Sequence, residues 1–284
     1  MIHEHIPVGT YCPAIKTAVP ESGAELVSYV REPSGALAER EGRWGVIVVP
    51  GGGYRVLAPS ESEPAALSFL GGGCQAFVLR YSLTPAPYPT QLLELAGAVA
   101  YLRRQRERYQ LSHIAVCGLS AGGHLTGCLC NLWNDPALSE ALQTEPELLR
   151  PDAAVLCYPV ISASAPKLSP VFERLLGKGS APGKLSLETS VTPGNPPAFL
   201  WATVGDPQVP VEHSLLYASA LRAAGVPFEL HLFQNGPHAM SVATADSSRD
   251  PRWSSSHVAH WTELACEWLN GEALKQPGEE PPLP

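Results

Sequence analysis

Strand-like apolar runs alternate with helix-like segments along almost all of the 284 residues. Residues 44–49 (WGVIVV) form a short β-branched run that ends in glycines, as is typical of a strand buried on both faces. Residues 92–102 place apolar side chains at the i, i+3, i+4, i+7 spacing of one buried helix face. This alternation predicts an α/β fold with a mostly parallel, doubly wound sheet of about eight strands and helices on both faces.

The domain organisation follows from the same pattern. Residues 21–272 are predicted to form a single domain, because the chain contains no internal repeat and no second core. Residues 1–20 are expected to form a loose N-terminal segment. Residues 273–284 lack apolar content and are expected to form a disordered tail. Residues 161–190, rich in Ser, Pro, Gly and Lys, are a candidate small lid, with Phe172 and Leu175 expected to face inward.

Charge and cysteine usage exclude several functional classes. The formal net charge of −8 argues against binding nucleic acid or an anionic membrane, because both need clustered Lys and Arg. No apolar run approaches the ~20 residues needed to span a bilayer. The start of the chain has no signal-peptide pattern, and the seven cysteines include no C-x-x-C pair. We therefore expect a reduced, cytoplasmic protein without a metal, while a secreted form that has lost its leader stays an alternative.

Ser120 lies in a G-x-S-x-G pentad that joins a strand-like run to a helix-like run. A strand followed directly by a helix forces a sharp turn, and Gly118 and Gly122 leave room for it because they carry only hydrogens. The turn places the N–H of Ala121 at a helix N-terminus, where negative charge is favoured. The pentad therefore predicts an exposed nucleophile. The alternative is a chance match that forms an ordinary tight turn, with His124 one turn further along as a supporting residue.

Two further reactive residues follow their own strands. Asp206 comes after the apolar run FLWATVG, and His238 comes after FELHLF and the turn QNGP. A carboxylate in such a loop can orient a histidine, and the histidine can take a proton from a serine. The chain order Ser, Asp, His is that of the α/β-hydrolase arrangement. The alternatives are a helix-capping role for Asp206 and a plain surface position for His238.

The glycine run PGGGY (residues 50–54) follows the strand at residues 44–49. Acyl transfer creates an oxyanion, which needs fixed N–H donors, and consecutive glycines let the backbone approach a carbonyl oxygen closely. The rival interpretation is a phosphate-binding loop. That loop would need a G-x-x-x-x-G-K-[ST] or G-x-G-x-x-G pattern, and the chain has neither.

Taken together, these segments resemble the α/β-hydrolases of the acetyl-esterase and xylanase-associated kind, near the hormone-sensitive-lipase-like esterases. The resemblance covers roughly residues 44–240 in the family's order. It rests on the segments VVPGGGYRVLAPSESEPAALSFL, LRYSLTPAPYP, VCGLSAGGHL, PPAFLWATVGDPQVP and GVPFELHLFQNGPHAM. It implies an α/β-hydrolase fold, with Ser120 as nucleophile and Asp206 and His238 as its partners. It also implies an oxyanion hole made by the N–H groups of Gly52, Gly53 and Ala121.

The chain departs from the family pattern at two prolines. Pro50 stands where many of these esterases carry histidine, so any orienting role of that histidine is lost. Pro207 follows Asp206 and restricts it towards extended backbone conformations. Neither proline removes a reactive group.

The sequence thus predicts a serine carboxylic-ester hydrolase that forms an acyl-enzyme and needs no cofactor. The resemblance implies short-chain substrates, often O-acetyl groups on sugars, so the expected partner is a small-molecule or oligosaccharide ester. Tyr54, Leu119 and Val209 are the candidate substrate-pocket residues. Two alternatives stay open: a small-amide hydrolase such as an arylformamidase or peptidase on the same scaffold, and a non-catalytic hydrolase-like receptor.

Overall fold

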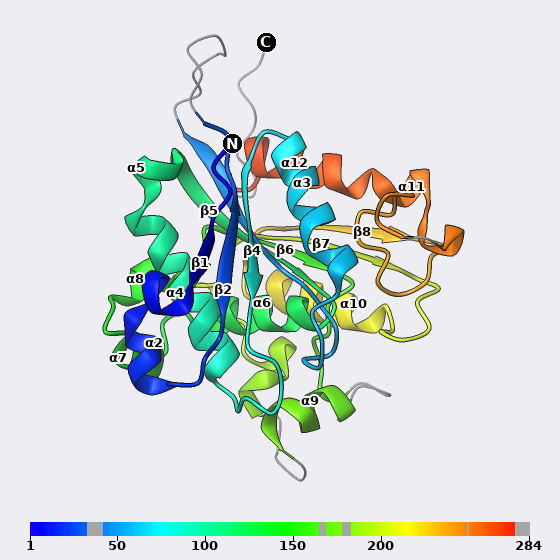
Figure 1. Cartoon of the computed structure of the whole chain (residues 1–284). Helices are drawn as coiled ribbons and strands as arrows, with labels where there is room; N and C mark the ends of the chain where they lie inside the picture. Colours follow the sequence, from blue (N-terminus) through cyan, green and yellow to red (C-terminus); the bar gives the residue numbers. More distant parts are fainter. Residues whose placement is uncertain (33–41, 165–168, 178–182, 249, 276–284) are drawn as a thin grey trace.

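An eight-stranded sheet with helices on both faces forms the centre of the molecule in a computed structural model (Figure 1). The structure describes residues 1–32, 42–164, 169–177, 183–248 and 250–275. The strand order is β1-β2-β4-β3-β5-β6-β7-β8. The strands are β1 (His5–Pro7), β2 (Glu25–Tyr29), β3 (Arg43–Val49), β4 (Gln75–Arg80), β5 (Leu111–Leu119), β6 (Ala153–Cys157), β7 (Ala198–Thr203) and β8 (Phe228–Phe233). The strand β2 runs antiparallel to β1 and β4, and all other pairs are parallel, which confirms the predicted sheet.

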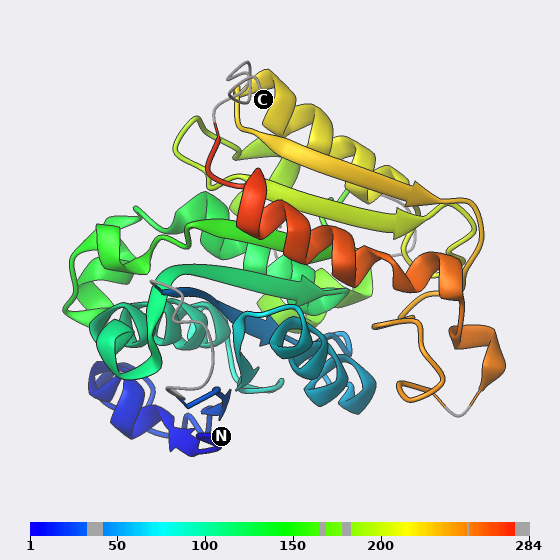
Figure 2. The same cartoon turned by 90° about the horizontal axis from the view of Figure 1, so that it is seen from above.

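The described helices cover the sheet in two layers (Figure 2). They are α1 (Val8–Tyr11), α2 (Pro13–Ala18), α3 (Glu63–Gly71), α4 (Thr90–Arg104), α5 (Arg106–Tyr109), α6 (Ala121–Leu132), α7 (Pro136–Leu142), α8 (Pro146–Leu149), α9 (Ser169–Leu176), α10 (Glu212–Ala223), α11 (Ser256–Ala259) and α12 (Trp261–Gly271). Buried side chains of α1, α2, α4, α6 and α10 belong to one apolar core. Buried side chains of α3, α11 and α12 belong to the other core, across the sheet.

The two cores explain why the central strands are apolar at every position. In β3, Ile47 and Val49 belong to one core, and Val46 and Val48 belong to the other. All four side chains are fully buried. Successive side chains of a strand point to opposite faces, so a strand covered on both faces needs an unbroken apolar run. The prediction that residues 44–49 form a strand buried on both faces is therefore confirmed.

The expectation of a loose N-terminal segment over residues 1–20 is wrong. The strand β1 pairs antiparallel with β2, and the next two short helices bury Val8, Tyr11 and Ile15 in the core beside α4. A three-residue strand and helices of four and six residues are too short to show a hydrophobic period in the sequence. The boundaries of the domain at residues 21 and 272 stay a prediction. Most of the expected tail, residues 276–284, lies outside the described residues.

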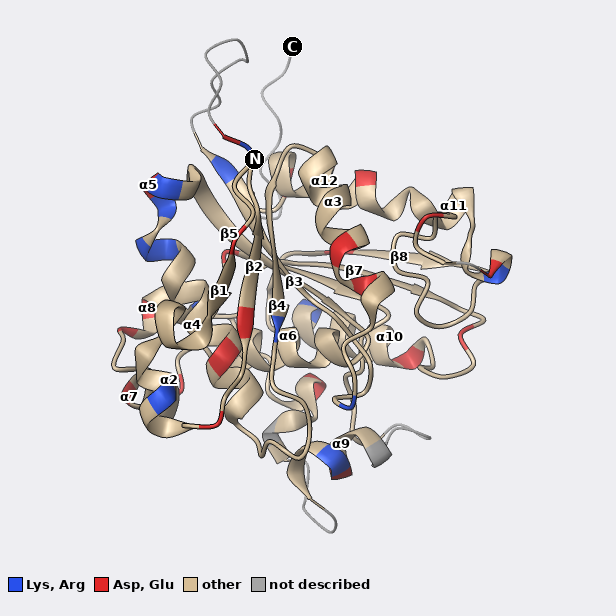
Figure 3. Ribbon diagram, viewed as in Figure 1, with Lys and Arg blue, Asp and Glu red and all other residues tan. Residues whose placement is uncertain are grey.

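Four general properties bear on the functional classes that the sequence argued against. Within the described residues, no helix has the length and apolar character needed to cross a membrane, and no three His, Cys, Asp or Glu side chains gather as a metal site. All seven cysteines are buried thiols. Acidic and basic residues are spread over many elements, with a basic group at α5 (Figure 3).

Candidate active site

Ser120 sits at the junction of β5 and α6 in a backbone conformation that residues with side chains rarely adopt. Its φ is 54° and its ψ is −116°, and α6 begins at the next residue. A Cβ on Gly118 would collide with Thr126 Oγ1, and a Cβ on Gly122 would collide with the Val49 carbonyl oxygen. The turn therefore leaves room only for hydrogens at the two flanking positions.

The substitution Gly122→Ala is expected to destabilise the protein by about 3 kcal/mol or more, because the added methyl group meets rigid strand backbone. Thermal or denaturant unfolding measures this change. Gly71→Ala is the matched control, because a Cβ there meets nothing within 4 Å at the end of α3. The control is expected to change the free energy of unfolding by less than about 1 kcal/mol. Equal effects of the two substitutions would contradict this account of the turn.

Ser120, His238 and Asp206 form a continuous hydrogen-bonded chain. Ser120 Oγ lies 2.7 Å from His238 Nε2, and His238 Nδ1 lies 2.6 Å from Asp206 Oδ2. The three residues are 7–8% exposed and follow β5, β7 and β8. With the proton on Nδ1, the imidazole donates to the carboxylate and accepts from the serine hydroxyl. The structure therefore brings together the three residues that the sequence singled out.

Asp206 is held by its own loop. Its Oδ1 accepts hydrogen bonds from the N–H groups of Gln208 at 2.8 Å and Val209 at 3.0 Å. The helix α10 begins at Glu212 and has Val211 as its N-cap, so Asp206 does not cap that helix. Both carboxylate oxygens are thus occupied, one by the backbone and one by the histidine.

Two aromatic residues support His238. The Tyr158 ring packs edge-on against the imidazole with the ring centroids 5.1 Å apart. The Trp253 indole donates from Nε1 to the His238 carbonyl oxygen at 2.7 Å. These contacts restrict the histidine ring and its backbone. The alternative of a plain surface histidine therefore does not match its surroundings.

The glycine loop after β3 lies beside Ser120. Gly52 and Gly53 have φ values of +120° and +62°, and both line a cavity together with Ala121, the first residue of α6. Within the described part of the chain, the N–H groups of Gly52 and Gly53 donate no hydrogen bond. An N–H group in the first turn of a helix also has no acceptor inside the helix. All three predicted oxyanion-hole residues therefore line the space above the serine.

Glu61 is a buried acid in this cavity that the sequence analysis missed. Its Oε2 accepts from the N–H of Gly51 at 2.8 Å, and its Oε1 accepts from the Tyr158 hydroxyl at 2.8 Å. It thereby links the glycine loop to the tyrosine that packs on His238. Glu61 stands in the polar stretch PSESEP, where no pattern distinguishes a buried acid from the exposed Glu63 nearby.

Burial raises the pKa of Glu61, although the hydrogen bond from Tyr158, the nearby His238 and the bond from Gly51 oppose the shift. The native state then holds this proton more tightly than the unfolded chain. Glu61 therefore contributes stability below its ordinary pKa near 4.5, and this contribution is lost as the pH rises through the native pKa. Glutamine keeps a similar shape but does not titrate.

For Glu61→Gln we therefore expect a free energy of unfolding that improves relative to the wild type as the pH rises from about 4 to about 7. Chemical denaturation across this range measures the difference. The exposed Glu63→Gln is the control for simple loss of a charge. A difference that stays constant with pH for Glu61→Gln would contradict the raised pKa.

Two of the three candidate pocket residues do not line the cavity. Tyr54 has a φ of 60° and is fully buried, with its hydroxyl 2.9 Å from His124 Nδ1. Leu119 belongs to the core on the far side of the sheet. Val209 does line the cavity. The expectation for Tyr54 and Leu119 is therefore wrong, because their backbone positions turn both side chains into the interior.

His124 supports the loops around Ser120 from within the core. Its Nε2 lies 2.9 Å from the carbonyl oxygen of Leu185, and its ring packs edge-on against Phe172. Burial lowers the pKa of His124 to about 4. A neutral, doubly hydrogen-bonded imidazole suits a structural role, as the sequence predicted.

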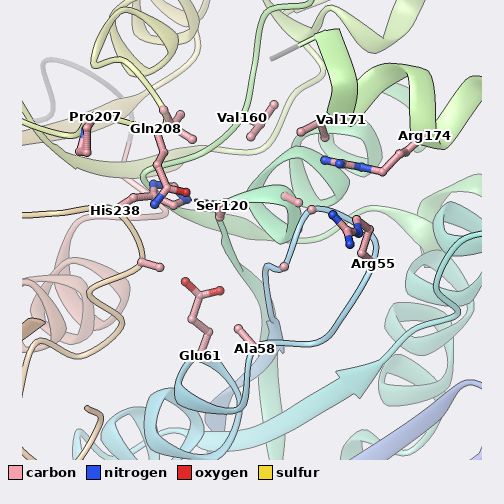
Figure 4. Close-up of a pocket in the computed structure, with 15 residues that line it drawn as sticks. Arg55, Ala58, Glu61, Ser120, Val160, Val171, Arg174, Pro207, Gln208 and His238 are labelled. Atoms are coloured by element: carbon pink, nitrogen blue, oxygen red, sulfur yellow. Dashed lines mark hydrogen bonds between the residues drawn. The ribbon is translucent and has the colours of Figure 1, made fainter. Parts of the chain in front are cut away.

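The cavity has a volume of about 540 Å³ and opens above Ser120 (Figure 4). Its lining residues are Gly52, Gly53, Arg55, Ala58, Glu61, Ser120, Ala121, Val160, Val171, Arg174, Pro207, Gln208, Val209, His238 and Ala239. The helix α9, from the candidate lid segment, supplies Val171 and Arg174. Phe172 and Leu175 are buried, as expected. Residues 165–168 and 178–182 of that segment lie outside the described residues, so the lid stays a prediction.

Comparisons with known proteins agree with this arrangement. A family model described as the alpha/beta hydrolase fold matches residues 46–180. The chain is 35% identical to endo-1,4-beta-xylanase B of Butyrivibrio fibrisolvens over 70% of this chain and 32% of that protein. It is 26% identical to an acetylxylan esterase of Xylanibacter ruminicola over 78% of this chain and 44% of that protein. The chain therefore spans less than half the length of these two relatives.

A solved structure matches over nearly its full length. The crystal structure of an acetyl ester-xyloside bifunctional hydrolase from Caldicellulosiruptor lactoaceticus superimposes with a TM-score of 0.78 at 34% sequence identity. The match covers 94% of this chain and 95% of that chain.

Proposed function

The chain belongs to the α/β-hydrolase family, and from this premise we propose that it is a serine esterase acting on short-chain acyl esters. The observation that carries the proposal is the hydrogen-bonded chain from Ser120 through His238 to Asp206 beside the cavity. A serine hydroxyl is a weak nucleophile until an adjacent base removes its proton. The family and the geometry thus support the same chemistry.

In the proposed mechanism, His238 takes the proton of Ser120 as the serine oxygen attacks the acyl carbonyl carbon. The N–H groups of Gly52, Gly53 and Ala121 stabilise the oxyanion. His238 then gives its proton to the leaving alcohol, and an acyl-serine remains. Water attacks this acyl-enzyme by the same route, which releases the acid and restores the serine.

O-acetyl groups on carbohydrates are the proposed natural substrates. The support is that one relative is an acetylxylan esterase and that a solved structural neighbour is an acetyl ester-xyloside bifunctional hydrolase. An acetyl group is also small enough to fit beside the loop of Gly52 and Gly53. The cavity of about 540 Å³ leaves room for at least part of a sugar.

An activity screen tests this function. Acetylated mono- and oligosaccharides, nitrophenyl esters and formyl-arylamines are compared, with the Ser120→Ala protein as the control. We expect release of acetate from the acetylated sugars by the wild type alone. Faster turnover of formyl-arylamines would favour a small-amide hydrolase instead. A folded protein that turns over none of them would favour a receptor.

A further inference from the structure

Two arginine side chains line the active-site cavity. Arg55 follows the glycine loop after β3, and Arg174 comes from α9. Figure 4 shows both guanidinium groups at the same end of the cavity, on the other side of Ser120 from His238. A Cβ placed on Gly53 would lie only 3.1 Å from Arg174 Nη2. The cationic pair therefore adjoins the place where an acyl carbonyl is expected to bind.

Within the described residues, the two guanidinium groups lack the acidic partners that four other arginines of this chain have. Arg80, Arg103, Arg108 and Arg252 each form an ion pair with a carboxylate. Within the described residues, Arg55 and Arg174 form none. The Arg174 Nε is also buried and has no hydrogen-bond partner among the described residues.

Among the described residues that line this cavity, the acidic side chain forms no ion pair with either arginine. Glu61 lines the same cavity, but its two oxygens already accept hydrogen bonds from Gly51 and Tyr158. Burial, together with the nearby charge of Arg55, lowers the pKa of Arg174. Two cations held close together repel each other, and a bound anion would remove that repulsion.

We propose that Arg55 and Arg174 bind a carboxylate group carried by the ester substrate. This inference rests on the proposed esterase function and narrows its substrate class to acidic esters. A guanidinium group presents N–H donors in a planar fork that matches the two oxygens of a carboxylate. The pair would thus fix the substrate in the cavity by charge and by geometry, while Ser120 attacks the ester carbonyl.

Matched pairs of acidic and neutral esters test the proposal. One arm compares phenyl hydrogen adipate with methyl phenyl adipate, which places the carboxylate on the acyl half. The other arm compares 4-acetoxybenzoate with methyl 4-acetoxybenzoate, which places it on the alcohol half. Release of the phenol gives kcat/KM for each ester. We expect the wild type to favour the acidic member of at least one pair by about tenfold or more.

The double variant Arg55→Gln, Arg174→Gln is expected to lower this acidic-to-neutral ratio by about tenfold or more. A general loss of activity lowers kcat/KM for both esters of a pair, so it does not change their ratio. The intrinsic reactivity of each ester is the same with every variant, so it does not affect the comparison of ratios between variants. Arg55→Lys, Arg174→Lys keeps the charge but not the fork, so an intermediate ratio is expected. Arg222→Gln, on the exposed side of α10, is the matched control and is expected to keep the wild-type ratio.

The outcomes separate this inference from the proposed function. An acidic-to-neutral ratio that the double variant leaves unchanged in both arms would overturn the carboxylate site. If the wild type still hydrolyses the neutral esters and Ser120→Ala does not, the esterase function stands without it. If no ester is hydrolysed, the proposed function fails, and the inference fails with it.

Discussion

Replacing Ser120 with alanine is expected to lower kcat/KM for nitrophenyl acetate by at least about 10⁴-fold. The substitution removes only the Ser120 hydroxyl, whose oxygen lies 2.7 Å from His238 Nε2. No acyl-enzyme can then form, and only the cavity and the N–H donors remain to assist attack by water. Steady-state kinetics with purified protein measure the loss.

The loss of activity can be attributed to the missing hydroxyl only if the Ser120→Ala protein keeps its fold. Ser120 is at the turn between β5 and α6, and its N–H donates to the Cys157 carbonyl oxygen through the backbone, which alanine preserves. We expect an unfolding midpoint close to that of the wild type. Activity within tenfold of the wild type in a folded Ser120→Ala protein would remove this serine from the mechanism.

For Asp206→Asn we expect a loss of about 10⁴-fold in kcat with little change in the fold. Asp206 Oδ1 accepts two backbone hydrogen bonds, from Gln208 and Val209, so the carbonyl oxygen of asparagine must take that place. Its NH₂ group then faces His238 Nδ1, where a donor meets a donor unless the histidine changes tautomer. The other tautomer carries its proton on Nε2 and cannot accept one from Ser120.

Kinetics across a range of pH, with circular dichroism as the check on folding, measure this effect. Gln208→Ala is the matched control in the same loop, because the N–H that reaches Asp206 belongs to the backbone and is kept. We expect that control to keep its triad geometry and to lose far less activity than Asp206→Asn. An asparagine variant that turns over esters at a rate near that of the wild type would contradict the orienting role of the carboxylate.

The sheet and the three reactive residues could be predicted because their signals are local. The run over residues 44–49 is apolar at every position, and both faces of β3 are indeed covered by separate cores. Ser120, Asp206 and His238 each follow a strand, and parallel neighbouring strands end at the same edge of the sheet. Strand position, together with the chain order Ser, Asp, His and the family resemblance, was therefore the basis for expecting these side chains to meet.

The cavity walls could not be predicted because they depend on how distant loops pack. Tyr54 adjoins the glycine run, yet its positive φ turns the ring towards His124 and away from the cavity. Glu61 links the glycine loop to Tyr158, which lies almost 100 residues further along the chain and donates a hydrogen bond to it. Arg174 enters the site from α9, in a segment whose composition suggested only a lid.

Covalent labelling tests most directly the claim that Ser120 is an activated nucleophile. The folded protein is treated with a fluorophosphonate probe, digested, and analysed by mass spectrometry. The account predicts a single labelled peptide containing Ser120, no label in Ser120→Ala, and much slower labelling in Asp206→Asn, because the histidine there cannot take the serine proton. A folded protein that hydrolyses esters but carries no label at Ser120 would contradict it.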